Sequence, residues 1–131
     1  MIDDYFLEIE TIIKEFFNIR SLTLKKKIYS SKQGYISGSI VFDNCYRLDF
    51  IEVKDIDIKS KVKYSYHYMD DKQNLVFRYD NAPHHADIKT FPHHKHEKDA
   101  IKSSLEPTLE DILMEIFRIQ KSMRIKYETN S

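Results

Sequence analysis

The feature that most constrains the fold is an alternation of side-chain character with a period of two residues, which extends from Ser21 to Asp80. It is clearest in residues 61–68, where every second side chain is apolar or aromatic: Val62, Tyr64, Tyr66 and Tyr68. Successive side chains of a β-strand point to opposite faces of the sheet. The pattern therefore predicts an antiparallel sheet with one face on the core and the other face toward solvent.

Five strands are predicted, at residues 22–28, 35–42, 46–53, 61–69 and 75–79. Several of the links between them are short and polar, such as the loop that ends at Gly34 and the turn signal Asp43-Asn44. Because hairpin-length links join strands that are neighbours in the sheet, we expect an antiparallel meander.

A helix is predicted at each end of the chain. Residues 3–18 carry apolar side chains at helical spacing, and Asn18 is a plausible stop: the stripe is Tyr5, Phe6, Ile9, Ile12, Ile13, Phe16 and Phe17. The second helix opens after Pro107, with Thr108 as N-cap and Asp111 three residues later. The expected fold class is α+β, in a single domain over residues 1–131: an N-terminal helix, a five-stranded antiparallel meander sheet, a His-rich loop and a C-terminal helix.

Charge and cysteine content bound the surroundings of the protein. The 21 basic and 21 acidic residues cancel, so only their local distribution is informative. The stretch from Arg20 to Lys32 is basic, and we interpret it mainly as a solvated strand edge, with a phosphate-binding surface as the alternative. The single Cys45 allows no internal disulfide, and neither a signal peptide nor an apolar span is evident, so we expect a cytoplasmic protein without a membrane segment.

Histidines are concentrated in one segment. Pro83-His84-His85 and Pro92-His93-His94 repeat a tripeptide nine positions apart, and His96 follows. Histidine exchanges protons near neutral pH, with an unperturbed pKa of about 6.5, and it is a common metal ligand. We expect residues 81–102 to form a His-rich loop whose His85, His94 and His96 converge in one partly exposed pocket.

The segments Tyr64-Ser65-Tyr66-His67-Tyr68-Met69-Asp70, Phe77-Arg78-Tyr79-Asp80-Asn81-Ala82-Pro83-His84-His85 and Thr90-Phe91-Pro92-His93-His94-Lys95-His96 resemble the TumE family of toxin–antitoxin proteins. The Asp4-Tyr5-Phe6 opening and the start of the last helix are similar too, so the resemblance extends over nearly the whole chain. It implies a small cytoplasmic toxin that is bound by a helix-turn-helix antitoxin. It implies no catalytic mechanism, so the residue roles below are inferred from chemistry.

The leading hypothesis is metal-free RNA cleavage, or another modification of RNA, by residues 78–96. One imidazole takes the proton of the 2′-hydroxyl and a second protonates the leaving 5′-oxygen, while a cation holds the phosphate. His85 and His94 are the first candidates for the pair, His96 is a rival for either role, and Arg78 or Lys95 can hold the phosphate. Lys95, Tyr79, His84 and His93 are the predicted substrate contacts.

Two alternatives remain open. If residues 92–97 are extended, His94 and His96 lie on one face and can bind zinc or another divalent metal, with His85 or His84 and with Asp80 or Asp87 completing the ligands. In the other alternative the loop carries no chemistry, and the protein is a non-enzymatic toxin whose His loop docks on a partner. His67, which lies opposite the tyrosine face, is interpreted as structural or as the rim of the site.

Overall fold

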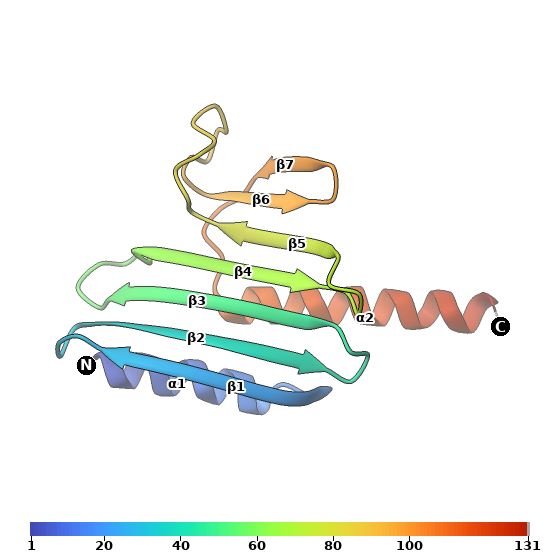
Figure 1. Ribbon diagram of the computed structural model, residues 1–131, viewed down its shortest axis with the longest axis horizontal. Helices are drawn as coiled ribbons and strands as arrows, with labels where there is room; N and C mark the ends of the chain where they lie inside the picture. The colour runs from blue at the N-terminus through green and yellow to red at the C-terminus, as the bar shows by residue number, and fades with distance from the viewer. Residues whose placement is uncertain (131) are drawn as a thin grey trace.

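A seven-stranded antiparallel sheet in the order β1-β2-β3-β4-β5-β6-β7 forms the centre of the molecule (Figure 1). The computed structural model describes residues 1–130, and the side chains of residues 1–126. The elements in chain order are α1 (Ile2–Glu15), β1 (Ile19–Ile28), β2 (Gln33–Phe42), β3 (Arg47–Asp55), β4 (Lys63–Met69), β5 (Leu75–Asp80), β6 (His94–Glu97), β7 (Ala100–Ser103) and α2 (Leu109–Asn130). The predicted α+β class, the meander and the two terminal helices are confirmed. Ser131 lies outside the described residues.

The predicted number of five strands is wrong, because the His-rich segment forms two more. β6 pairs with β5, and β7 pairs with β6 through His94↔Ser103 and Glu97↔Ala100. This hairpin has no apolar face, and the four residues of β7 are all exposed. A strand that buries no apolar face gives no period-two hydrophobic signal, which is why the sequence indicates a loop here.

The first helix is shorter than predicted and ends at Glu15 rather than at residue 18. Phe16 is already extended, with φ −81° and ψ 143°. Asn18 has a φ of 67°, a left-handed conformation that Asn tolerates better than most residues, and β1 starts directly after it. The expected cap of the second helix is present: the Asp111 backbone N–H donates to Thr108 Oγ1, and the Thr108 N–H donates to the Asp111 carboxylate.

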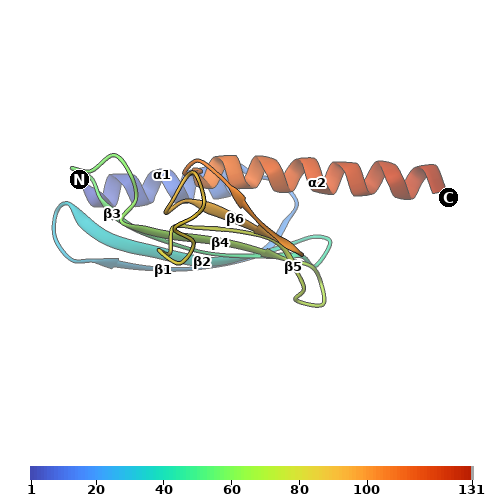
Figure 2. The ribbon, with the colours of Figure 1, turned by 90° about the horizontal axis from the view of Figure 1, so that it is seen from above.

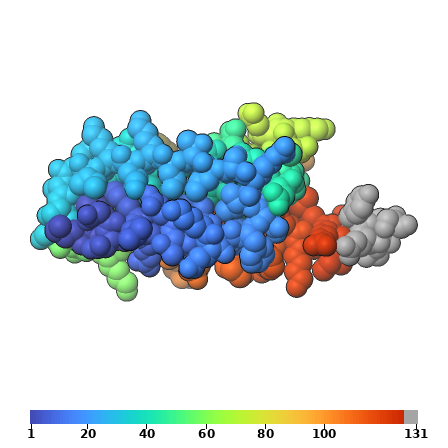
Figure 3. Space-filling view, turned by 90° about the horizontal axis from the view of Figure 1, so that it is seen from below, coloured from blue at the N-terminus to red at the C-terminus, as the bar shows by residue number. Residues whose placement is uncertain are grey.

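Both helices cover the same face of the sheet (Figure 2), and α1 packs along the β1–β2 edge (Figure 3). The core between the layers includes the predicted aromatic face of β4, since Tyr64, Tyr66 and Tyr68 are 0–1% exposed. Val62, which was predicted to share that face, precedes β4 and is 56% exposed. Neither helix, over its described residues, is long and apolar enough to cross a membrane.

The opposite face of the sheet carries no helix (Figures 1 and 2). The strand residues that alternate with the core positions point to this side, among them Lys63, Ser65 and His67 of β4. We call it the open face. Its β5–β6 part holds the residues that the sequence singles out for chemistry.

Candidate active site

Two cross-strand residue pairs place four polar side chains together on the open face. Arg78 and Asp80 are two positions apart in β5, and His94 and His96 are two positions apart in β6. The antiparallel register pairs Arg78 with His96 and Asp80 with His94. Because residues i and i+2 of a strand share a face, this register brings all four side chains to one place. His85, from the loop before β6, completes what we call the histidine site.

The Asp80 carboxylate is the centre of this site. It is only 5% exposed, and it accepts hydrogen bonds from Arg78 Nε at 2.9 Å and from the Ala82 backbone N–H at 3.0 Å. His94 Nε2 lies 2.9 Å from Asp80 Oδ1, and His96 Nε2 lies 3.4 Å from Asp80 Oδ2. A buried carboxylate is retained where donors and cations compensate for its lost hydration, and Asp80 has both.

His94 is held between two acceptors. Its Nδ1 lies 2.8 Å from the Pro92 carbonyl oxygen, and its Nε2 faces Asp80. Carbonyl and carboxylate oxygens only accept hydrogen bonds, so both contacts are satisfied at once when both ring nitrogens carry a proton. The ring is 2% exposed. His94 is therefore placed to support its neighbours and not to meet a large substrate directly.

His96 Nε2 faces a donor at a shorter distance than an acceptor. It lies 3.1 Å from Arg78 Nη2 and 3.4 Å from Asp80 Oδ2. Because a guanidinium only donates, this nitrogen accepts the shorter hydrogen bond and is unprotonated. Burial lowers the pKa of His96 below its ordinary value, and the positive charge of Arg78 lowers it further, against the opposing charge of Asp80. His96 is thus a neutral imidazole next to a cation.

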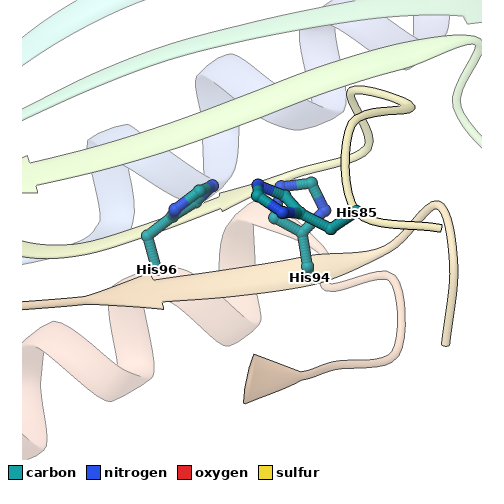
Figure 4. A group of neighbouring side chains, drawn as sticks. All are labelled: His85, His94 and His96. Carbon is teal, nitrogen blue, oxygen red and sulfur yellow. The ribbon is translucent and has the colours of Figure 1, made fainter. Parts of the chain in front are cut away.

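His85 brings the third ring to the site (Figure 4). Its centroid lies 5.0 Å from that of His94 and 5.7 Å from that of His96, and the His94 and His96 centroids are 4.7 Å apart. One nitrogen from each of the three rings lies within 4.8 Å of the others. The three side chains converge as expected, and the partly exposed pocket expected around them stays a prediction.

His85, His94 and His96 are also the residues that can hold a metal. The Pro92 carbonyl fixes His94 Nδ1, so Nε2 is the nitrogen left to bind an ion, which is the arrangement that orients many metal-binding histidines. Asp80 could supply an oxygen. The Arg78 guanidinium weighs against a cation here, because it already occupies His96 Nε2 and adds a positive charge.

Other predicted site residues lie elsewhere. Lys95 alternates with His94 and His96 and points to the helical layer, where its Nζ lies 2.5 Å from Glu115 Oε1. Tyr79 points the same way and donates to Glu115 at 2.8 Å. His93 stacks on Tyr64 with centroids 5.8 Å apart, and the Tyr64 hydroxyl lies 2.8 Å from His93 Nδ1.

His84 and His67 lie around the site rather than in it. His84 is exposed in the loop next to His85. His67 pairs in register with Arg78, on the face opposite the tyrosines as expected. Burial lowers the pKa of His67, with a further contribution from Arg78.

Asp80 is the site residue that sequence reasoning underrated, since it appeared only as one possible metal ligand. Its signal was nonetheless present. Arg78-x-Asp80 and His94-x-His96 are two pairs with strand spacing, and they meet once the two segments are paired.

The fold and the site define a small α+β protein with a His, Asp and Arg cluster near one edge of a one-sided sheet. The chain belongs to the TumE toxin family, because the family model described as Toxin TumE matches residues 6–122. It is therefore the toxin component of a toxin–antitoxin system, and its partner is an antitoxin. No curated protein and no solved structure matches the chain.

Proposed function

We propose that this toxin inhibits growth by cleaving RNA at the histidine site, without a metal. The observation that carries the proposal is the pairing of a neutral His96 with the half-exposed guanidinium of Arg78, next to the second accessible ring of His85. A base, a phosphate-binding cation and an acid are the groups that cleavage through the 2′-hydroxyl needs.

The roles follow from accessibility. Arg78 turns from His96 to the phosphate, which frees His96 Nε2 to take the proton of the 2′-hydroxyl. The 2′-oxygen forms a bond to phosphorus, the bond to the 5′-oxygen breaks, and His85 gives that oxygen its proton. The products are a 2′,3′-cyclic phosphate end and a 5′-hydroxyl end. Asp80 and His94 position the other groups.

A zinc-dependent function is the second candidate, and the approach of three imidazole nitrogens within 4.8 Å favours it. His85, His94 and His96 would be the ligands, and a bound metal would activate water for phosphodiester cleavage. Such a site predicts stoichiometric zinc in the purified protein and activity that is lost in chelator and restored by added metal.

The test compares RNA and DNA of the same sequence as substrates of the purified protein, with and without chelator, together with elemental analysis for zinc. We expect RNA cleavage that persists in chelator, intact DNA and cyclic phosphate ends. His96→Ala or His85→Ala should reduce the rate by about 10²–10⁴-fold, the usual contribution of an acid–base residue. His84→Ala is the matched control, because this exposed histidine neighbours His85 and lies outside the site.

Three results would redirect the proposal. Stoichiometric zinc with chelator-sensitive activity would select the metal site. Equal activity of the His85→Ala, His96→Ala and His84→Ala variants would remove imidazole chemistry from the mechanism. If both nucleic acids stay intact while expression still stops growth, the protein is a binding toxin whose His loop docks on its target.

We expect the antitoxin to be a helix-turn-helix protein, which the product of the adjacent gene would test.

A further inference from the structure

We infer that the open face of the sheet is a binding surface for single-stranded RNA, which leads the strand from β1 to the histidine site. The inference rests on the proposed function for its choice of RNA. The surface itself is argued from three independent features: the register of the strands, the distribution of cations, and the exposed aromatic rings.

The register connects the histidine site to the far edge of the sheet. The residues paired across the strands from His94 are Asp80, Ser65, Ile51, Ser37 and Lys25. The neighbouring row starts at His96 and continues through Arg78, His67, Asp49, Ser39 and Thr23. Strands are about 4.8 Å apart, so the five spacings from β6 to β1 span about 24 Å. Small polar side chains in these rows leave the face accessible to a ligand.

The cations divide between the two faces of β1. The sequence shows that Lys25, Lys26 and Lys27 cannot all point one way, and the structure shows how they separate. Lys26 points to the helical layer and pairs with Glu10 of α1 at 2.5 Å. Lys25 and Lys27 point to the open face, in register with Ser37 and Tyr35.

Other cations lie on the same face. Lys63 shares a row with Lys27, Arg78 lies in the histidine site, and Arg47 pairs with Asp49 at 3.1 Å. Lys25 and Arg47 line a shallow depression of about 420 Å³ whose other walls include Thr23, Ser37, Ser39 and Asp49. Asp49 offsets the charge of Arg47. The hydroxyl groups and Lys25 suit a phosphate and its ribose.

The acids of this face have polar partners. Asp49 pairs with Arg47, which offsets both charges, and Asp80 is buried in the histidine site. Asp55 at the end of β3 accepts from the neutral amide of Gln33 at 2.8 Å and keeps its charge. α1 lies on the other side of the sheet and is acidic over its length, with Lys14 as its single base. Because α1 is acidic, a polyanion is favoured on the open face over the part of the opposite face that α1 covers.

Aromatic rings indicate that the polyanion has unpaired bases. Tyr29, which is 57% exposed, lies just after β1, and its ring centroid is 6.2 Å from that of Tyr35. Lys27 Nζ lies 5.5 Å from the Tyr29 ring centroid. Exposed rings beside cations stack on the bases of single strands, whereas the bases of a duplex are already stacked on each other.

The experiment measures binding of a labelled 12-nucleotide single-stranded RNA by anisotropy over a range of salt concentrations. The full chain carries His96→Ala, so that the probe stays intact. Adding Lys25→Gln and Lys27→Gln should weaken binding about tenfold or more. It should also lower the slope of log affinity against log salt by about 1.4, which is about 0.7 for each phosphate contact. Lys25→Arg with Lys27→Arg should retain binding.

Tyr29→Leu tests stacking separately. It should weaken binding about tenfold and leave the salt slope unchanged, because the lost contact is not ionic. The matched control is Lys14→Gln with Lys121→Gln, which removes two exposed lysines from the helices. This control should change affinity less than about twofold.

Each contrary result has its own meaning. Equal weakening by the control pair, or equally tight binding of duplex RNA, would overturn the inference. RNA cleavage by the native sequence with no effect of the β1 variants would also overturn it, while the proposed function stands. Binding that depends on Lys25 and Lys27 without any cleavage would support the RNA-binding surface and refute the proposed function. A stable dimer that the β1 variants disrupt would assign the open face to a second copy of the chain.

Discussion

Replacing Asp80 with alanine should destabilise the protein more than any other single loss of charge on the open face. The substitution removes the acceptor of the His94 ring and of the Ala82 N–H, in a position where His94 is 2% exposed. A buried donor left without a partner costs about 1–3 kcal/mol. The His94 ring is buried and the Ala82 N–H is only part-buried, so the two losses together give about 2–4 kcal/mol. The contact with Arg78, which is 42% exposed, adds less than about 1 kcal/mol.

Asp49→Ala is the matched control, since Asp49 lies on the same face and pairs with Arg47. The two side chains are 42% and 36% exposed, so the expected loss is about 0–1 kcal/mol. Urea denaturation gives both values from the shift of the midpoint at constant slope. For a chain of this size each kcal/mol lowers Tm by about 4 °C, so Asp80→Ala should melt about 8–16 °C below the native protein.

Asp80→Asn separates the loss of the charge from the loss of the acceptor. The amide keeps an acceptor for the Ala82 N–H and removes the charge that faces Arg78 and His94. We expect a loss of about 1–2 kcal/mol, because charge-assisted hydrogen bonds become ordinary ones. If Asp80→Ala and Asp49→Ala cost the same, Asp80 is not the centre of the site and its assigned role is wrong.

The parts of the fold that could be predicted are those that bury apolar side chains periodically. The stripe of α1 and the tyrosines of β4 meet a core, so their spacing reports their structure. The β6–β7 hairpin could not be found this way, because its neighbours are Asp80, Arg78 and Glu115 rather than apolar groups. Polar contacts stabilise a strand without leaving a hydrophobic period in its sequence.

The histidine site could be predicted in composition but not in pairing. Histidine content pointed to His85, His94 and His96, yet the 13 residues between Asp80 and His94 are too many for a hairpin link to fix the register. Without the register, Asp80 had no assigned neighbours. The position of Lys95 could have been predicted. The alternation that puts His94 and His96 on one face of a strand puts Lys95 on the other face. Lys95 was assigned to the site only because it lies next to these histidines in the sequence.

Two further predictions concern stability. Burial and Arg78 lower the pKa of both His96 and His67. At pH values just below about 6.5 the unfolded chain therefore binds more protons than the native protein. The free energy of unfolding should fall as the pH falls through this window. Urea titrations from pH 7.5 to 5 should show this fall, and replacing both rings with Gln should flatten it; an unchanged slope in that variant would assign the acid sensitivity to other groups. Gly38→Ala should cost about 1–3 kcal/mol, the usual range for overpacking, because an added Cβ would lie 2.6 Å from Phe50 Cε1 and 2.8 Å from Leu24 Cδ2 inside the core. The double variant Gly38→Ala with Leu24→Ala should lose less stability than the sum of the two single losses, since the smaller side chain makes room for the new methyl group. A loss equal to that sum would show that the methyl group is accommodated elsewhere.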